Sequence, residues 1–237
     1  MSFRETLEQA AAQAGFPLTG EQLDRFQQYT DLLLETNKSL NLTAITDPEE
    51  VALKHMVDSL LVYNPKTFHN HTIADVGTGA GFPGIPLKIY DLSMRVTLID
   101  SLQKRLNFLK QVVQELGLGQ VRCLHARAEN AGQDPALREK FDVVTARAVA
   151  ALPVLAEYCL PLVRVGGTFY AMKGRHFQEE TDEAHHAVEV LGGKIKEVRP
   201  VTLPGLDDQR AIITIEKVRH TPAQYPRKAG TASKKPL

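Results

Sequence analysis

Hydrophobic residues in the first seventy positions recur at the three- and four-residue spacing of one face of an α-helix. The apolar positions of the clearest stretch are Leu23, Phe26, Tyr29 and Leu33. Thr19 and Gln22 precede this stretch with the spacing of a capping box. Asp47 followed by Pro48 is a second start signal, because Asp caps helices and Pro is favoured at the first helical position. Residues 1–70 are therefore predicted to be helical.

From residue 72 onward the pattern changes to short apolar runs that alternate with helical stretches. The runs cover residues 72–76, 95–99, 120–125, 141–146 and 168–172. Residues 101–116 have apolar side chains at helical spacing, with Ser101 placed to cap the start and Gly117 placed to end the helix. Strands that alternate with helices predict a parallel sheet covered on both faces, with right-handed crossovers.

Two further strand-like runs, residues 194–201 and 210–217, are separated by a loop without a helical pattern. Neighbouring strands without a crossover helix are expected to be antiparallel. We therefore predict an α/β fold with a mostly parallel sheet and an antiparallel last strand. Its parts are an N-terminal helical region packed on the core (1–70), a domain built on the sheet (71–217) and a C-terminal tail (218–237).

Composition is that of an ordinary globular protein. Of the 237 residues 43% are hydrophobic, and no apolar run reaches the ~20 residues that span a bilayer. The first residues lack the basic and apolar pattern of a signal peptide, so we expect a cytoplasmic protein. Cys123 and Cys159 lie far apart among apolar neighbours, which favours buried thiols over a disulfide or a metal site.

Charge is unevenly distributed, although the formal net charge is zero. Residues 1–70 hold five Lys or Arg and ten Asp or Glu, whereas the end of the chain holds six cations and no acid. The six cations are Lys217, Arg219, Arg227, Lys228, Lys234 and Lys235. A basic arm whose six cations all contact phosphates would suit a nucleic acid, and a disordered solubilising tail is the alternative.

A glycine-rich loop follows the first predicted strand. Asp75 lies near the end of that strand, and Gly77, Gly79, Gly81 and Phe82 follow it. Glycines allow sharp turns and close approach of the backbone to a ligand, and open α/β sheets bind ligands at this edge. A dinucleotide fingerprint would need its third glycine where Phe82 stands. The G-x-G-x-G spacing after an acid instead resembles the first motif of class I S-adenosylmethionine (SAM)-dependent methyltransferases, which have a Rossmann-like sheet.

Acidic residues follow the next two strands at the same edge. Asp100, beside Ser101, ends the second strand, and its carboxylate can accept hydrogen bonds from both hydroxyls of a ribose. Ala128 and Glu129 follow the third strand, where methyltransferases commonly contact the adenine edge. Ordinary loop acids are the alternative for both carboxylates. Together with the glycine loop and Asp75, these residues predict a binding site for SAM.

Several stretches are similar to the RsmG (GidB) family, the bacterial small-subunit rRNA guanine-N7 methyltransferases. These stretches are residues 41–46, 54–59, 75–86, 99–105, 145–148 and 221–228. The resemblance covers essentially the whole chain. It implies methyl transfer from SAM, with S-adenosylhomocysteine as the product, to N7 of the guanine at conventional position 527 of 16S rRNA. It also implies cofactor contacts from Gly77, Phe82, Ala128, Glu129 and Arg147.

Two basic residues at strand ends are the candidate catalytic residues. Arg147 follows the fourth strand and could hold an RNA phosphate or stack on a base, and Lys173 follows the fifth strand. An exposed arginine and a solvated loop lysine are the alternatives. His55 and Asp58, one helical turn apart, could contact the substrate or pair within the protein. Methylation of guanine N7 needs no general base, because this nitrogen has a free lone pair and no proton.

Three other functions compete with methylation of rRNA. The basic tail disfavours a small-molecule methyltransferase, the full set of cofactor residues disfavours a non-enzymatic RNA-binding or ribosome-assembly protein, and the glycine spacing disfavours a dinucleotide oxidoreductase. The expected partners are 16S rRNA or the small ribosomal subunit. We expect no membrane, no metal and a monomeric protein.

Overall fold

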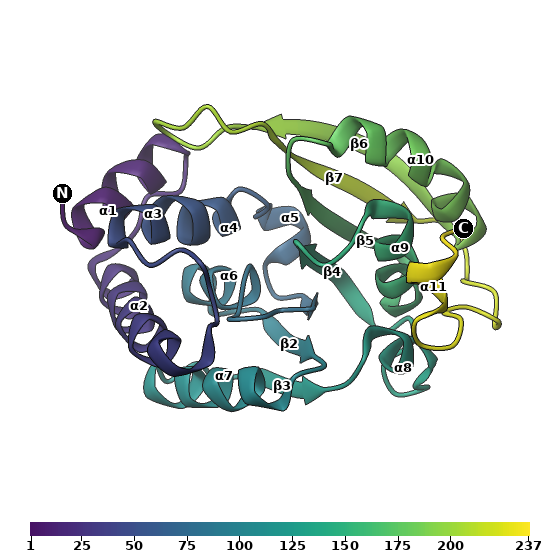
Figure 1. The fold of residues 1–237 in the computed structure, drawn as a ribbon, viewed down its shortest axis with the longest axis horizontal. Coiled ribbons are helices and arrows are strands. Elements are labelled where there is room, and N and C mark those ends of the chain that lie inside the picture. Colours follow the sequence, from purple (N-terminus) through teal and green to yellow (C-terminus); the bar gives the residue numbers. More distant parts are fainter.

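The computed structural model describes all 237 residues and confirms an α/β fold built on one seven-stranded sheet (Figure 1). The strand order is β3-β2-β1-β4-β5-β7-β6. The strands are β1 (Thr72–Val76), β2 (Arg95–Asp100), β3 (Val121–His125), β4 (Phe141–Arg147), β5 (Val163–Lys173), β6 (Gly193–Val201) and β7 (Arg210–Lys217). β7 is antiparallel to both of its neighbours, and the pairs among β1 to β5 are parallel. All seven predicted runs are strands, and only β5 begins markedly earlier than predicted.

The helices occupy the stretches between strands and most of the first seventy residues. They are α1 (Phe3–Gln13), α2 (Gly20–Leu40), α3 (Pro48–Val51), α4 (Asp58–Leu60), α5 (Pro65–Phe68), α6 (Gly84–Tyr90), α7 (Gln103–Glu115), α8 (Ala128–Gln133), α9 (Leu152–Cys159), α10 (Phe177–Val190) and α11 (Thr231–Lys234). A π-helical segment (Ala52–Val57) joins α3 to α4. The predicted capping box starts α2, and Asp47 caps α3. None of the helices has the length and hydrophobicity of a membrane span.

Alternate residues of the central strands face two separate hydrophobic cores. Ile73 and Val143 pack with the N-terminal helices, α6 and α7, whereas Ala74 and Val144 pack with α8, α9 and α10. This alternation follows from the two-residue period of a strand. Figure 1 shows the N-terminal helices at one end of the molecule and α9 to α11 at the other. With both faces covered, the carboxyl edge of the parallel strands is left to form a site.

The start of α7 differs from the prediction, because Ser101 does not cap it. The N-cap residue is Leu102, which makes no side-chain cap bond. Asp100 acts nearby instead, since its Oδ1 accepts a 2.9 Å hydrogen bond from the Leu102 amide. The carboxylate that ends β2 therefore shapes the turn that Ser101 was predicted to stabilise.

The C-terminal tail is folded onto the domain and is not a free basic arm. It runs over α8 and α9 and includes the short helix α11 (Figure 1). Lys217 is fully buried, where burial lowers its pKa to about 8, and Arg227 pairs with the buried Glu157. The expectation that all six cations serve a polyanion is therefore wrong, whereas Lys228, Lys234 and Lys235 remain exposed.

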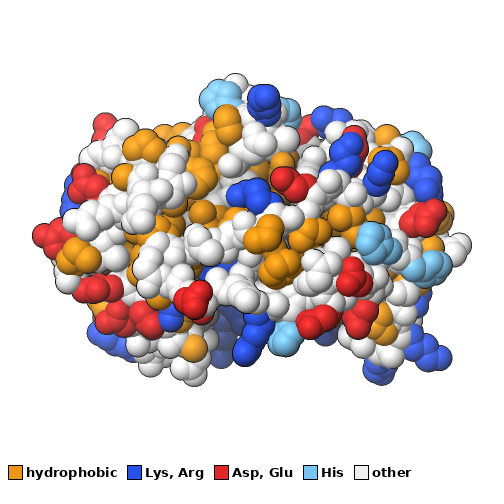
Figure 2. Space-filling view, turned by 90° about the horizontal axis from the view of Figure 1, so that it is seen from above, with side chains coloured by type: hydrophobic (Ala, Val, Ile, Leu, Met, Phe, Trp, Pro, Cys, Tyr) orange, Lys and Arg blue, Asp and Glu red, His pale blue; other side chains and the backbone are white.

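The surface reflects the uneven charge of the sequence. Figure 2 shows acidic side chains gathered at the end formed by the N-terminal helices, on the left of that view. The opposite end presents basic, acidic and histidine side chains together. On this face, a polyanion would therefore be repelled from the N-terminal end more than from the rest of the surface.

Candidate functional site

The loop after β1 needs its glycines because of its backbone conformation. Gly77, Gly79 and Gly81 have φ values of 67°, 60° and 110°, a region that other residues rarely adopt. A Cβ atom on Gly77 would also lie 2.6 Å from a methyl carbon of Val149. The glycines are therefore required by the shape of the loop itself.

The N-terminal helices hold this loop in place. Tyr29 of α2 is fully buried, and its hydroxyl donates a 2.6 Å hydrogen bond to the carbonyl of Ala80. Phe82 packs beside it, with the ring centroids of Tyr29 and Phe82 5.6 Å apart. The ring of His55 stacks on Phe82 at 4.4 Å. Phe82 therefore belongs to the apolar support of the loop.

Asp75 supports the loop from within β1. Its carboxylate accepts hydrogen bonds from the Thr78 hydroxyl (2.6 Å), the Gly84 amide (3.0 Å) and the Thr145 hydroxyl (3.2 Å). No part of Asp75 is exposed, and burial raises its pKa to about 6. Its side chain therefore supports the loop from within the protein, and the predicted contact of Asp75 with the cofactor stays a prediction.

The raised pKa of Asp75 predicts a pH dependence of stability. The stabilising contribution is complete below the ordinary pKa of 3.8 and is lost as the pH rises through about 6, because the unfolded chain gives up the proton first. Between pH 4 and 7 the free energy of unfolding should fall by roughly 2 kcal/mol more in the wild type than in Asp75→Asn. Urea denaturation at both pH values measures the difference.

Asparagine is a suitable comparison at this position. It has the shape of aspartate and keeps an oxygen that can accept from Thr78 and Gly84. Parallel pH profiles for the two proteins would show that the buried carboxyl of Asp75 holds no proton in the folded state, contrary to the prediction.

A cavity of about 310 Å³ opens beside the glycine loop at the carboxyl ends of β1, β2 and β3. We call it the glycine-loop cavity. Its lining includes five predicted cofactor-binding residues, which are Gly77, Asp100, Ser101, Ala128 and Glu129. The other five predicted residues do not line it, namely Asp75, Gly79, Gly81, Phe82 and Arg147. The structure therefore brings together Gly77 and the residues that follow β2 and β3, whereas the cofactor contacts of the other five residues stay predictions.

Asp100 connects three parts of the cavity wall. Its Oδ2 accepts from the Gly79 amide at 2.9 Å and from the Arg105 guanidinium at 3.4 Å, and its Oδ1 accepts from the Leu102 amide. The residue is only 3% exposed. A carboxylate can accept about four hydrogen bonds, so Asp100 retains capacity for a ribose hydroxyl.

Three residues of this wall were missed by the sequence analysis. Arg105, Arg127 and Tyr158 also line the glycine-loop cavity. Arg105 lies in the first turn of α7, and Arg127 directly precedes Ala128. Both are close in sequence to predicted site residues, so their place in the cavity wall could have been predicted. Tyr158 comes from α9, and no local pattern links it to the site.

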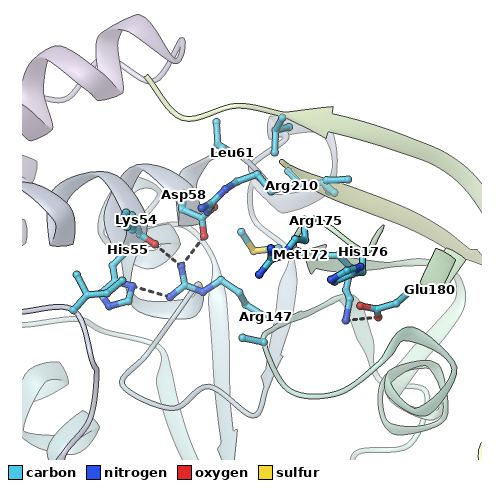
Figure 3. Close-up of a pocket in the computed structure, with 17 residues that line it drawn as sticks. Lys54, His55, Asp58, Leu61, Arg147, Met172, Arg175, His176, Glu180 and Arg210 are labelled. Carbon is cyan, nitrogen blue, oxygen red and sulfur yellow. Dashed lines mark hydrogen bonds and ion pairs between the residues drawn. The ribbon is translucent and has the colours of Figure 1, made fainter. Parts of the chain in front are cut away.

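A second cavity of about 490 Å³ lies next to the first, and Figure 3 shows it in close-up. We call it the arginine cavity, because Arg147, Arg175 and Arg210 are part of its lining. Its apolar side chains come from Ile45, Leu61, Met172, Val201 and Ile212. The cavity thus combines cationic groups with apolar walls.

Arg147 is the centre of a hydrogen-bonded cluster in the arginine cavity (Figure 3). Its Nη1 donates to Asp58 Oδ2 at 2.7 Å and to the Lys54 carbonyl at 3.2 Å, and its Nη2 lies 3.2 Å from His55 Nδ1. The guanidinium carbon lies 4.8 Å from the centre of the Phe82 ring. Four of the stretches that carry the family resemblance therefore meet at or beside this side chain.

His55 is held neutral within the cluster. A guanidinium can only donate, so Nδ1 accepts from Arg147 and Nε2 carries the hydrogen that it donates to Thr43 Oγ1 at 2.7 Å. Burial, and then the charge of Arg147, lower the pKa of His55 to about 4. Both ring nitrogens are therefore occupied at neutral pH.

Asp58 bridges two arginines from different strands. Arg147 of β4 binds its Oδ2, and Arg210 of β7 donates to its Oδ1 at 2.6 Å. The Nε of Arg210 is buried without a partner, and such a donor is costly to leave unpaired. His55 and Asp58 thus pair within the protein and also line the arginine cavity, so their contact with the substrate stays a prediction.

Lys173 lines the arginine cavity and is also bound within the protein. Its Nζ donates to the Ala150 carbonyl at 2.7 Å and lies 2.6 Å from Glu180 Oε2. Glu180 also accepts from the Leu152 amide at 2.8 Å. Lys173 and Glu180 therefore both bind the backbone of residues 150–152, and a catalytic role for Lys173 stays a prediction.

The two cavities share one wall residue, Ala148. Ala148 directly follows Arg147 and has a φ of 55°, which turns the chain sharply after β4. The next residue, Val149, packs on Gly77 and lines the glycine-loop cavity. A ligand in one cavity would therefore be separated from a ligand in the other only by the short segment around Ala148.

Comparison with solved structures places this fold among known ones. The structure of M. jannaschii TYW2 in complex with AdoMet has a TM-score of 0.51 to this chain at 17% sequence identity. The match covers 64% of this chain and 71% of that one. At this identity the likeness concerns the fold.

Sequence comparison identifies the family. A family model described as rRNA small subunit methyltransferase G matches residues 22–212. The ribosomal RNA small subunit methyltransferase G of Lactobacillus johnsonii is 52% identical over 95% of this chain and 96% of its own length. The protein of the same name from Alkaliphilus metalliredigens is 48% identical over the full length of both chains. With these matches and the site geometry above, the chain belongs to the rRNA small subunit methyltransferase G (GidB) family.

Proposed function

We propose that this protein transfers a methyl group from SAM to N7 of one guanine in 16S rRNA. The observation that carries the proposal is the pair of cavities that meet at Ala148. A methyl donor in one cavity and an acceptor base in the other would face each other across that segment. When bound, SAM supplies a methyl group already activated on a sulfonium, so the protein needs mainly to align the reactants.

The residues of the glycine-loop cavity fit SAM. Asp100 presents a nearly buried carboxylate at the end of β2, where ribose hydroxyls can donate to it. Gly77 leaves backbone without a side chain at the cavity wall. The fold neighbour TYW2, whose structure contains AdoMet, supports the same cofactor here.

The arginine cavity fits an RNA base taken out of its stack. Bases in single-stranded loops can be splayed into a pocket and held by apolar side chains and guanidinium groups. Met172 and Ile212 provide apolar surface there, and Arg147 and Arg175 provide cationic groups for base or phosphate contacts. The proposed substrate would place the reaction in the cytoplasm.

The hydrogen bonds of the cluster are compatible with N7 of guanine as the methyl acceptor. His55 uses both ring nitrogens, and each carboxylate oxygen of Asp58 binds an arginine. Lys173 is held by Glu180. The three are thus engaged within the protein, whereas methylation of an exocyclic amine or a hydroxyl would require a group that takes up a proton. Guanine N7 has no proton to lose, so the cluster is compatible with that acceptor.

The test is transfer of labelled methyl from SAM to small ribosomal subunits, or to 16S rRNA, from a strain that lacks the modification. We expect close to one methyl group per rRNA, located by cleavage of the chain at 7-methylguanosine. Label at another atom of the RNA would reject N7. SAM binding without any transfer to RNA would instead favour a small-molecule substrate or a role in ribosome assembly.

A further inference from the structure

The C-terminal tail contacts residues that form the glycine-loop cavity. Glu129 lines that cavity, and its Oε1 accepts a 2.9 Å hydrogen bond from the Gly230 amide. Glu129 is 6% exposed, so its carboxylate depends on partners within the protein. The tail therefore supplies a partner to a side chain at the adenine end of the proposed cofactor site.

Arg227 anchors the tail to Glu157, the residue that precedes Tyr158 in the wall of the glycine-loop cavity. Its guanidinium donates to both carboxylate oxygens of Glu157 at 2.6 to 3.1 Å, and its backbone amide donates to Oε1 at 2.7 Å. Glu157 is 1% exposed and belongs to α9. The next residue of α9, Tyr158, lines the glycine-loop cavity. The buried ion pair thus fixes the backbone from which Tyr158 extends.

The tail around Pro226 also contacts α8 and the turn that follows this helix. Pro226 packs on Gly132 so closely that a Cβ atom there would lie 2.8 Å from the proline ring. Gln133 donates to the Pro226 carbonyl at 2.8 Å. Arg138 donates to the carbonyls of Tyr225 and Thr221 at 2.6 and 2.8 Å. These contacts involve backbone atoms of the tail, so they require one docked conformation.

We propose that the docked tail is a positioning element of the cofactor site, which holds Glu129 and Tyr158 in the geometry that binds the adenosine part of SAM. The proposal rests on the assignment of the glycine-loop cavity to SAM. Undocking would remove the partners that the tail gives to the carboxylates of Glu157 and Glu129, so α8 and α9 would lose contacts that fix their positions at the cavity wall. The tail then has two separable parts, the clamp formed by Arg227 and Gly230 and the exposed Lys228, Lys234 and Lys235.

The test compares two adjacent cations that carry the same charge. Arg227→Met removes the clamp, and Lys228→Met removes an exposed charge next to it. We expect the Kd for SAM, measured by calorimetry without RNA, to rise roughly 10-fold in Arg227→Met and to stay within about twofold in Lys228→Met. Turnover at saturating SAM should be retained in Arg227→Met, so that the KM for SAM rises while kcat does not fall.

Two further variants keep the proposal testable if Arg227→Met does not fold. Arg227→Lys retains the charge without the two-pronged contact and should raise the Kd for SAM by a smaller factor, about two- to fivefold. Replacing Lys228, Lys234 and Lys235 together by alanine should weaken RNA binding and leave the Kd for SAM unchanged. An unchanged Kd for SAM in both folded Arg227 variants, or an equal loss in Lys228→Met, would overturn the proposal. Failure of the wild type itself to bind SAM would instead reject the proposed function.

Discussion

Replacing Arg147 by methionine is expected to slow methyl transfer by roughly 100-fold at saturating SAM, with little change in SAM affinity. Arg147 lines the arginine cavity and not the glycine-loop cavity, so its loss should affect the acceptor base and not the donor. The variant also removes the hydrogen bonds to Asp58 and to the Lys54 carbonyl. Single-turnover rates with excess SAM measure the effect on transfer, and calorimetry measures the affinity.

Two comparisons make the Arg147 result specific. Arg147→Lys keeps the charge but cannot donate in the planar fork of a guanidinium, so it should recover only part of the rate. Arg199→Met removes an exposed arginine that also donates to a backbone carbonyl, that of Leu61 just after α4, and should leave the rate unchanged. A large loss of SAM affinity in Arg147→Met would assign the side chain to the cofactor, the contact that the family resemblance implied.

Asp100→Ala is expected to weaken SAM binding by about 1–3 kcal/mol, which is roughly 5- to 150-fold in Kd. The carboxylate accepts from the amides of Gly79 and Leu102, so the substitution also removes a bond that holds the glycine loop. A nearly buried acceptor is lost at the place where the ribose would donate. Calorimetric titration with SAM, and with its product, measures the change.

The effect of a loosened glycine loop on SAM affinity can be separated from the effect of a lost ribose contact. Asp100→Asn keeps one oxygen that can accept from Gly79, and it should bind SAM more tightly than the alanine variant while remaining weaker than the wild type. Hydrogen exchange of the Gly79 amide reports whether the loop has loosened. Wild-type affinity in Asp100→Ala would remove Asp100 from the ribose site.

Most of the fold could be predicted because its signals are local. The runs that became β1 to β7 are bounded by turn residues, and the antiparallel direction of β7 followed from the missing helix before it. The glycine loop was predicted because its spacing is contained in a few consecutive residues. Ser101 was misjudged as a cap because an adjacent carboxylate, that of Asp100, took over the same turn.

The arginine cavity could be predicted only in part, because its partners are distant in sequence. Arg210 reaches Asp58 across 152 residues, and no spacing rule relates two side chains on β7 and α4. Lys173 was expected in a cleft since strand ends often face one, and it does line the arginine cavity, but its ion pair with Glu180 on the following helix was not predicted. The tail was misjudged for a related reason. A count of cations does not reveal that Arg227 has a buried carboxylate as its partner.

Tyr29 links the stability of helix α2 to the conformation of the glycine loop, and so to the glycine-loop cavity where SAM is proposed to bind. Its hydroxyl bonds to Ala80, and it leaves no room for a side chain on Gly81. Whenever α2 opens transiently, the glycine loop loses this support, so both segments should exchange their amide hydrogens as one cooperative unit. Ligands that bind the loop would in turn slow exchange far away, in a helix that they never touch.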